Sequence, residues 1–99
     1  PSCKDCGGLL RPHVVWFGES LDTDLLHRAI EAARTSGVML VIGTSAVVQP
    51  AASLAMEAKA AGAVVAEINL EKTPQSGRMD YSLQGKAGEI VPKLLENWP

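Results

Sequence analysis

Two cysteines near the start of the chain have a spacing that could bind a metal ion. Cys3 and Cys6 form a Cys-x-x-Cys pattern that is followed by two glycines. Glycine lets backbone amides turn toward sulfur, and the pattern is typical of one half of a four-thiolate zinc site. The other soft ligands, His13 and His27, have no zinc-finger spacing from the cysteines. The pattern predicts a partial zinc site; a redox dithiol and two cysteines without a function are the alternatives.

A glycine turn in the middle of the chain could bind a nucleotide. Gly43, Thr44 and Ser45 follow the apolar run Val38–Ile42 and precede a stretch from Pro50 that favours a helix. In a parallel sheet, ligands bind at the carboxyl ends of the strands, where glycine permits close approach of the backbone. The turn matches neither a Gly-x-Gly-x-x-Gly pattern nor a Walker loop, so an ordinary strand-to-helix turn is the alternative.

Polar residues follow the next apolar run in the same way. Asn69 and Glu71 follow residues 63–68, where polar residues of an ordinary loop are the alternative interpretation. An amide and a carboxylate are suitable hydrogen-bond partners for ribose hydroxyls. Because the carboxyl ends of parallel strands meet at one edge of a sheet, we expect Asn69 and Glu71 to lie beside the Gly43 turn.

The elements that must position these residues follow from local patterns. Asp22 is a suitable N-cap for an amphipathic helix over residues 23–35, which Gly37 ends. The apolar runs at 38–42 and 63–68 predict strands, the first of them buried on both faces as in a parallel sheet. Residues 51–61 between them predict a helix. The order predicts a βαβ unit with parallel strands and therefore an α/β protein.

Three further elements are expected outside this unit. The β-branched and aromatic run at residues 13–17 predicts a short strand. Residues 80–84 predict another strand, and residues 87–98 predict a helix with Pro92 in its first turn.

Composition excludes several classes of protein. The 99 residues, 46% of them hydrophobic, are enough for one small domain. Nine Lys and Arg against eleven Asp and Glu, without a basic run, argue against nucleic acid or an acidic membrane as a partner. The longest uncharged stretch, residues 37–56, contains Gly43, Ser45 and Pro50 near its centre, which argues against a transmembrane helix.

Three motifs together resemble the C-terminal part of the sirtuins, a family of NAD-dependent protein-lysine deacylases. They are Cys-x-x-Cys-Gly-Gly-x-x-Arg-Pro-His-Val-Val-Trp-Phe-Gly-Glu, Gly-Thr-Ser-Ala-Val-Val-Gln-Pro-Ala and Asn-Leu-Glu, in this order. The resemblance extends from Cys3 to the last predicted helix. The motifs look closest to a branch of bacterial and mitochondrial enzymes that remove acidic acyl groups such as succinyl as well as acetyl.

The resemblance implies a role for each matching residue. Cys3 and Cys6 match the second cysteine pair of a structural zinc module. The loop that lines the acyl-lysine tunnel and pairs with the substrate backbone is matched by Val15, Trp16, Phe17, Gly18 and Glu19. Gly43, Thr44 and Ser45 match a loop at the adenosine of NAD. Asn69, Leu70 and Glu71 match the ribose-binding strand end, and Ala87 matches a residue that contacts adenine.

The resemblance also implies a fold and a division of the chain. Residues 1–12 are expected to form part of the zinc module, and residues 13–99 the C-terminal half of a Rossmann-like parallel sheet with flanking helices. The glycine-rich NAD loop, the catalytic histidine and the first cysteine pair of the family would belong to an N-terminal half that this chain lacks. The isolated chain is therefore expected to be inactive.

The expected partners are NAD, zinc and acylated lysine side chains of proteins, and the expected location is a bacterial cytoplasm or the mitochondrial matrix. Two other functions remain open from the residues themselves. One is a nucleotide-binding module without catalysis, and the other is an interaction module stabilised by zinc.

Overall fold

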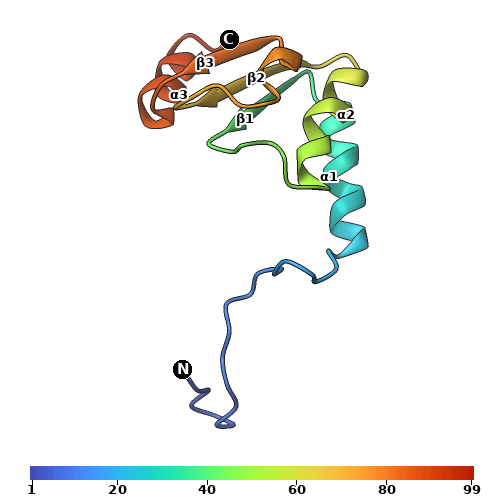
Figure 1. The fold of residues 1–99 in the computed structure, drawn as a ribbon, viewed down its shortest axis with the longest axis vertical. Coiled ribbons are helices and arrows are strands. Elements are labelled where there is room, and N and C mark those ends of the chain that lie inside the picture. The colour runs from blue at the N-terminus through green and yellow to red at the C-terminus, as the bar shows by residue number, and fades with distance from the viewer.

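The computed structural model describes residues 1–99, which form an α/β unit preceded by an extended arm (Figure 1). The elements follow in the order α1 (Thr23–Thr35), β1 (Val38–Ile42), the 3₁₀ turn η1 (Ala51–Ser53), α2 (Leu54–Ala60), β2 (Val64–Asn69), the 3₁₀ turn η2 (Ser76–Arg78), β3 (Tyr81–Gln84) and α3 (Ala87–Glu96). All three strands are parallel, in the order β1-β2-β3. The predicted α/β class and the parallel βαβ unit are confirmed.

Helix α1 has the bounds that its sequence predicts. The Asp22 side chain accepts hydrogen bonds from the backbone N–H groups of Asp24 and Leu25, at 2.9 and 3.1 Å. This satisfies donors that lack a partner within the first turn. The helix ends at Thr35, and Ser36 is its C-cap, directly before Gly37. Helix α2 differs from the expected range, because the segment after Pro50 begins as η1 and becomes α-helical only at Leu54.

Strand β2 is the centre of the sheet. It pairs with β1 from Val64 opposite Val38 to Ile68 opposite Ile42, and with β3 on its other side. Val65 and Ile68 are completely buried, whereas Val38 and Ile42 of β1 are about two fifths exposed. The prediction that β1 is buried on both faces is wrong, because Val38 and Ile42 point to the face opposite Val41, where α3 packs on β2.

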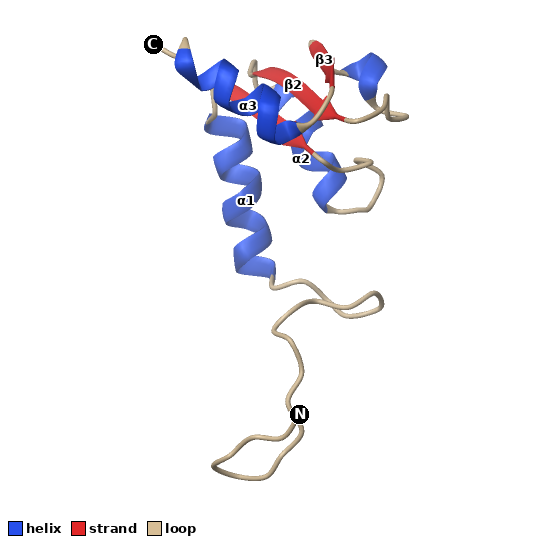
Figure 2. Ribbon diagram, turned by 90° about the vertical axis from the view of Figure 1, so that its left-hand side faces the viewer, coloured by secondary structure: helices blue, strands red, loops and turns tan.

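Helices cover both faces of the sheet. Helices α1 and α2 lie together on one side and α3 on the other (Figure 2). Alternate residues of a strand point to opposite faces, so Val65 joins the core beneath α2 while Ile68 points away from it. That core consists mostly of alanine, with Val41, Val65 and Met79 as its largest members. Small side chains let α2 approach the sheet closely, but they bury little apolar area.

Two predicted details are wrong. Residues 13–17 form no strand, because no second strand lies beside them to complete the hydrogen-bond ladder. Pro92 lies in the interior of α3 rather than in its first turn, since the helix already begins at Ala87. Proline there removes one backbone hydrogen bond from the helix.

The arm formed by residues 1–22 runs away from the α/β unit (Figure 1). The radius of gyration is 17.0 Å, compared with about 13 Å for a compact domain of this length. The arm carries the two cysteines and the 15–19 segment, so both lie outside the main core. None of the helices has the length and apolar character needed to span a bilayer.

Candidate functional site

The carboxyl ends of β1 and β2 lie side by side, as their parallel pairing predicts. The backbone N–H of Gly43 donates to the carbonyl of Ile68 at 2.9 Å. The Asn69 side-chain amide donates to the carbonyl of Thr44 at 2.8 Å. The turn after β1 and the end of β2 therefore form one continuous edge.

A pocket of about 330 Å³ opens at this edge. Its lining includes four of the seven residues expected at the nucleotide, namely Gly43, Asn69, Leu70 and Ala87, together with Ile68, Gly85 and Lys86. Thr44, Ser45 and Glu71 do not line it. The Thr44 hydroxyl instead accepts a hydrogen bond from the backbone N–H of Ala46, which shapes the turn itself.

Two glycines are required by the backbone around the pocket. Gly43 has a φ of +64° and Gly85 a φ of +147°, a range that side chains with a Cβ rarely adopt. A Cβ at Gly85 would lie 2.9 Å from Cδ1 of Ile90, while the space beside Gly43 is empty. The Gly43 backbone is therefore open to close approach by a ligand.

Asn69 has a structural task as well as a position at the pocket. Its Oδ1 accepts a hydrogen bond from the Leu70 backbone N–H at 2.8 Å, and its Nδ2 holds the carbonyl of Thr44. A carboxamide has two donor hydrogens and two acceptor lone pairs. One donor and one acceptor position of Asn69 therefore stay available for a ligand.

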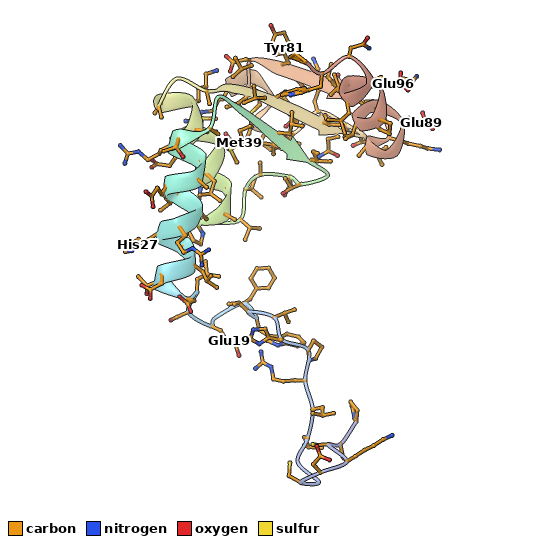
Figure 3. The ribbon with its side chains drawn as sticks, turned by 180° about the vertical axis from the view of Figure 1, so that it is seen from behind. Glu19, His27, Met39, Tyr81, Glu89 and Glu96 are labelled. Atoms are coloured by element: carbon orange, nitrogen blue, oxygen red, sulfur yellow. The ribbon has the colours of Figure 1, made fainter.

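The predicted substrate residues lie together on the arm. Val15, Trp16, Phe17, Gly18 and Glu19 line an open pocket of about 500 Å³ that Val48, Gln49, Pro50 and Ala51 border on its other side. Phe17 is 93% exposed. Glu19 lies on the arm, away from the sheet (Figure 3). The pocket thus joins the arm to the loop between β1 and α2.

An ion pair between Arg11 and Glu19, which sequence reasoning missed, links the two sides of this segment. Arg11 donates to both carboxylate oxygens of Glu19, at 2.8 and 3.0 Å, and to the carbonyl of Val14 at 3.0 Å. Glu19 also accepts the backbone N–H of Trp16 at 3.1 Å. Hydrogen bonds from the Arg11 guanidinium and, to a smaller extent, from the Trp16 N–H lower the pKa of Glu19 below its usual value. The signal in the sequence was an arginine and a glutamate on either side of a segment without Asp, Glu, Lys or Arg.

The two cysteines lie on a small hairpin. Cys3 donates its backbone N–H to the carbonyl of Gly8 at 2.8 Å and accepts from Gly7 at 2.9 Å, and Ser2 pairs with Leu9. Both thiols are free. Backbone N–H groups of Cys6 and Asp5 lower the pKa of the Cys3 thiol, which favours the thiolate form that binds metals. No group of three or more His, Cys, Asp or Glu side chains is placed to hold a metal ion, so the hairpin supplies two donors.

A buried carboxylate, Glu67, is the other feature that sequence reasoning missed. It lies in the middle of β2 and is completely buried. Its oxygens accept hydrogen bonds from the hydroxyls of Thr73, Ser76 and Ser82, the last at 2.8 Å. Burial alone would raise the pKa of Glu67, but these three hydroxyls hold it below its usual value. The sequence signal was a single glutamate inside an apolar strand, followed by hydroxyl residues.

Comparison with known proteins gives consistent results. A family model described as the Sir2 family matches residues 1–50. NAD-dependent protein deacylase 1 of Archaeoglobus fulgidus is 52% identical over 97 residues, which are 98% of this chain and 40% of that protein. The NAD-dependent protein deacylase of Mycobacterium tuberculosis is 48% identical over 99 residues, 100% of this chain and 42% of that protein. The chain thus spans about two fifths of the length of these relatives.

Solved structures with the same fold include ligand complexes. A crystal structure of a Sir2 homolog–NAD complex matches 97% of this chain and 38% of its own chain, with a TM-score of 0.86 and 52% identity. A structure of Sir2 bound to acetylated peptide matches 97% of this chain and 40% of its own, with a TM-score of 0.82 and 34% identity.

Proposed function

The chain belongs to the Sir2 family, and from that premise we propose that it is part of an NAD-dependent protein-lysine deacylase. The observation that carries the proposal is the pocket at the carboxyl ends of β1 and β2, where the Gly43 turn and Asn69 meet. The names of the relatives, NAD-dependent protein deacylases, support the same activity.

We propose that this edge holds the adenosine part of NAD. Gly43 allows the backbone to approach the nucleotide, Asn69 offers its free donor and acceptor to the ribose, and Leu70 and Ala87 supply apolar contact. When bound, NAD supplies the ADP-ribose group that receives the acyl group, and nicotinamide leaves. The chain's contribution is to position the nucleotide. Neither His13 nor His27 is assigned a catalytic role.

We propose that residues 15–19 bind the acyl-lysine peptide through its backbone. The backbone N–H groups of Val15, Phe17 and Gly18 donate no hydrogen bond within the chain. A segment of strand-forming residues without a strand partner can pair with an extended peptide, which is recognition by β-augmentation. The exposed ring of Phe17 would then lie against the substrate side chain.

We propose that Cys3 and Cys6 are two of the four ligands of a zinc ion. Cys3 and Cys6 fit two positions of a tetrahedral thiolate site, because one hairpin presents both, and further sequence of the full-length enzyme would supply the other two ligands. The motifs of residues 13–19 and 69–74 support acidic acyl groups such as succinyl besides acetyl as substrates. They also support a bacterial cytoplasmic or mitochondrial location.

Activity assays test the proposed function. We expect the full-length enzyme to remove acetyl or succinyl from a lysine peptide with consumption of NAD, and the 99-residue chain alone to show no turnover above a control without protein. NAD binding without any deacylation by the full-length protein would favour the nucleotide-binding module instead. Turnover by the isolated chain would overturn the view that its residues only position the reactants.

Replacing Asn69 with alanine in the full-length enzyme is expected to weaken NAD binding. Loss of one hydrogen bond to the ribose costs roughly 1 to 2 kcal/mol, which corresponds to about a fivefold to thirtyfold higher Kd. The KM for the acyl peptide should change much less, because residues 15–19 form that site. Isothermal titration with NAD measures the effect.

A melting temperature on the same variant separates two roles of Asn69, since its side chain also ties Leu70 to Thr44. A lower Tm with unchanged NAD affinity would remove Asn69 from the binding site. Asn97→Ala is the matched control, because Asn97 is an exposed amide at the end of α3 whose hydrogen bond to Lys93 lies outside the pocket lining.

A further inference from the structure

We propose that Arg11 is a positioning residue that holds residues 15–19 in the conformation that receives the acyl peptide. The inference rests on the proposed function and extends it to a residue that does not itself line the peptide pocket. Arg11 would act through Glu19 and the backbone rather than through contact with the substrate.

The ion pair between Arg11 and Glu19 joins the two ends of residues 11–19, so that these residues form a closed ring. The two terminal nitrogens of Arg11 bind the two carboxylate oxygens of Glu19, eight residues further along the chain, in a bidentate pair. One of these nitrogens also donates to the carbonyl of Val14. The guanidinium carbon lies 5.5 Å from the centroid of the Trp16 ring. One side chain thus contacts Val14 directly before the segment, Trp16 within it and Glu19 at its end.

Glu19 transmits this constraint to the backbone. The carboxylate oxygen that binds Arg11 at 3.0 Å also accepts the N–H of Trp16, while the Glu19 N–H donates to the carbonyl of Trp16. Two hydrogen bonds between Trp16 and Glu19, one donated by each backbone N–H, therefore hold the turn 16–19. This arrangement leaves the N–H groups of Val15 and Phe17 without partners and free to pair with a peptide.

An isolated ion pair on the surface stabilises a protein little, and both side chains here are partly exposed. The Arg11 pair differs because it is bidentate and shares its atoms with backbone groups. Few other hydrogen bonds hold the segment. Within residues 12–18, the bond from the Val14 N–H to the Pro12 carbonyl is the one that does not involve Arg11, Glu19 or Trp16. The conformation of the segment therefore depends on Arg11.

The test uses steady-state kinetics of the full-length enzyme. Arg11→Ala is expected to raise the KM for the acyl peptide about tenfold, since a charge-assisted bidentate pair orders the binding segment. The KM for NAD and kcat should stay within about twofold of wild type. Arg11→Lys, which keeps the charge but not the bidentate geometry, should give an intermediate peptide KM.

A double variant and a control complete the design. Arg11→Ala combined with Glu19→Gln should raise the peptide KM no further than the larger single effect, because both changes break the same ring. Arg28→Ala is the matched control, since Arg28 is an exposed arginine of α1 that belongs to neither pocket and makes no ion pair. It should leave both KM values unchanged.

Hydrogen exchange of the Trp16 amide gives a readout without turnover. Faster exchange in Arg11→Ala supports the role of Arg11 even if the assay detects no deacylation. A lack of deacylation by the wild-type enzyme would count against the proposed function and not against the role of Arg11. An unchanged peptide KM with an active enzyme, equal increases in both KM values, or a Trp16 amide that exchanges at the wild-type rate would overturn the role of Arg11.

Discussion

Replacing Glu67 with alanine is expected to lower the free energy of unfolding by about 3 kcal/mol, a large fraction of the stability of a small domain. The substitution leaves the half-buried hydroxyls of Thr73, Ser76 and Ser82 without their common acceptor. It also creates a cavity beside β2. Urea denaturation followed by circular dichroism measures the loss. Glu31→Ala, which removes an exposed carboxylate of α1, is the control and should change stability by less than about 0.5 kcal/mol.

The charge of Glu67 makes part of this stability dependent on pH. Because the folded protein lowers the pKa of Glu67, its carboxylate contributes stability above the pKa of the unfolded chain. That contribution is lost as the pH falls through the lower pKa of the folded state. The difference in unfolding free energy between wild type and Glu67→Gln should therefore shrink below about pH 4. A difference that stays constant at acid pH would show that folding does not change the pKa of Glu67, and a difference that grows at acid pH would show that the carboxyl group is protonated in the fold.

Replacing Gly43 with alanine in the full-length enzyme is expected to weaken NAD binding about thirtyfold, equivalent to about 2 kcal/mol. The added methyl group would occupy empty space next to the pocket, where the backbone would otherwise approach the nucleotide. A positive φ adds a further cost of about 1 kcal/mol to folding. Titration with NAD and thermal melting distinguish these two effects.

Gly62→Ala is a control for backbone strain. Gly62 also has a positive φ, at +101°, and free space where a Cβ would be, but it precedes β2 at the opposite end of the strand from Asn69. Gly62→Ala should lose at least as much stability as Gly43→Ala, because its φ lies further from the left-handed region that other residues adopt, and only Gly43→Ala should lose NAD affinity. Equal NAD affinity in the two variants would mean that the nucleotide does not approach the Gly43 backbone.

The features that sequence analysis predicted correctly depend on local patterns. The Asp22 cap and its amphipathic helix need only neighbouring residues, and the two apolar runs that become β1 and β2 predict strands by their composition. The meeting of Gly43 with Asn69 follows from parallel topology, because such strands end at the same edge.

The features that it missed depend on partners distant in the sequence. The β-forming run at 13–17 has the right residues for a strand but no neighbouring strand. Glu67 interrupts an apolar strand, and what makes it tolerable is a set of hydroxyls six, nine and fifteen residues away. The Arg11–Glu19 pair likewise depends on how the chain turns between the two residues, which their types alone do not specify.

The position of β1 at the outside of the sheet has a consequence for how the chain behaves in a concentrated sample. One side of this strand carries N–H and C=O groups that no neighbouring strand pairs with, next to apolar side chains such as Val38 and Ile42 that are partly exposed. Such a row is a template onto which another extended chain can add, and proteins usually protect it with charge, proline or a covering element. Strand β1 has no charged residue and no proline. Intermolecular pairing along β1 is therefore one route by which we expect the isolated chain to aggregate at high concentration.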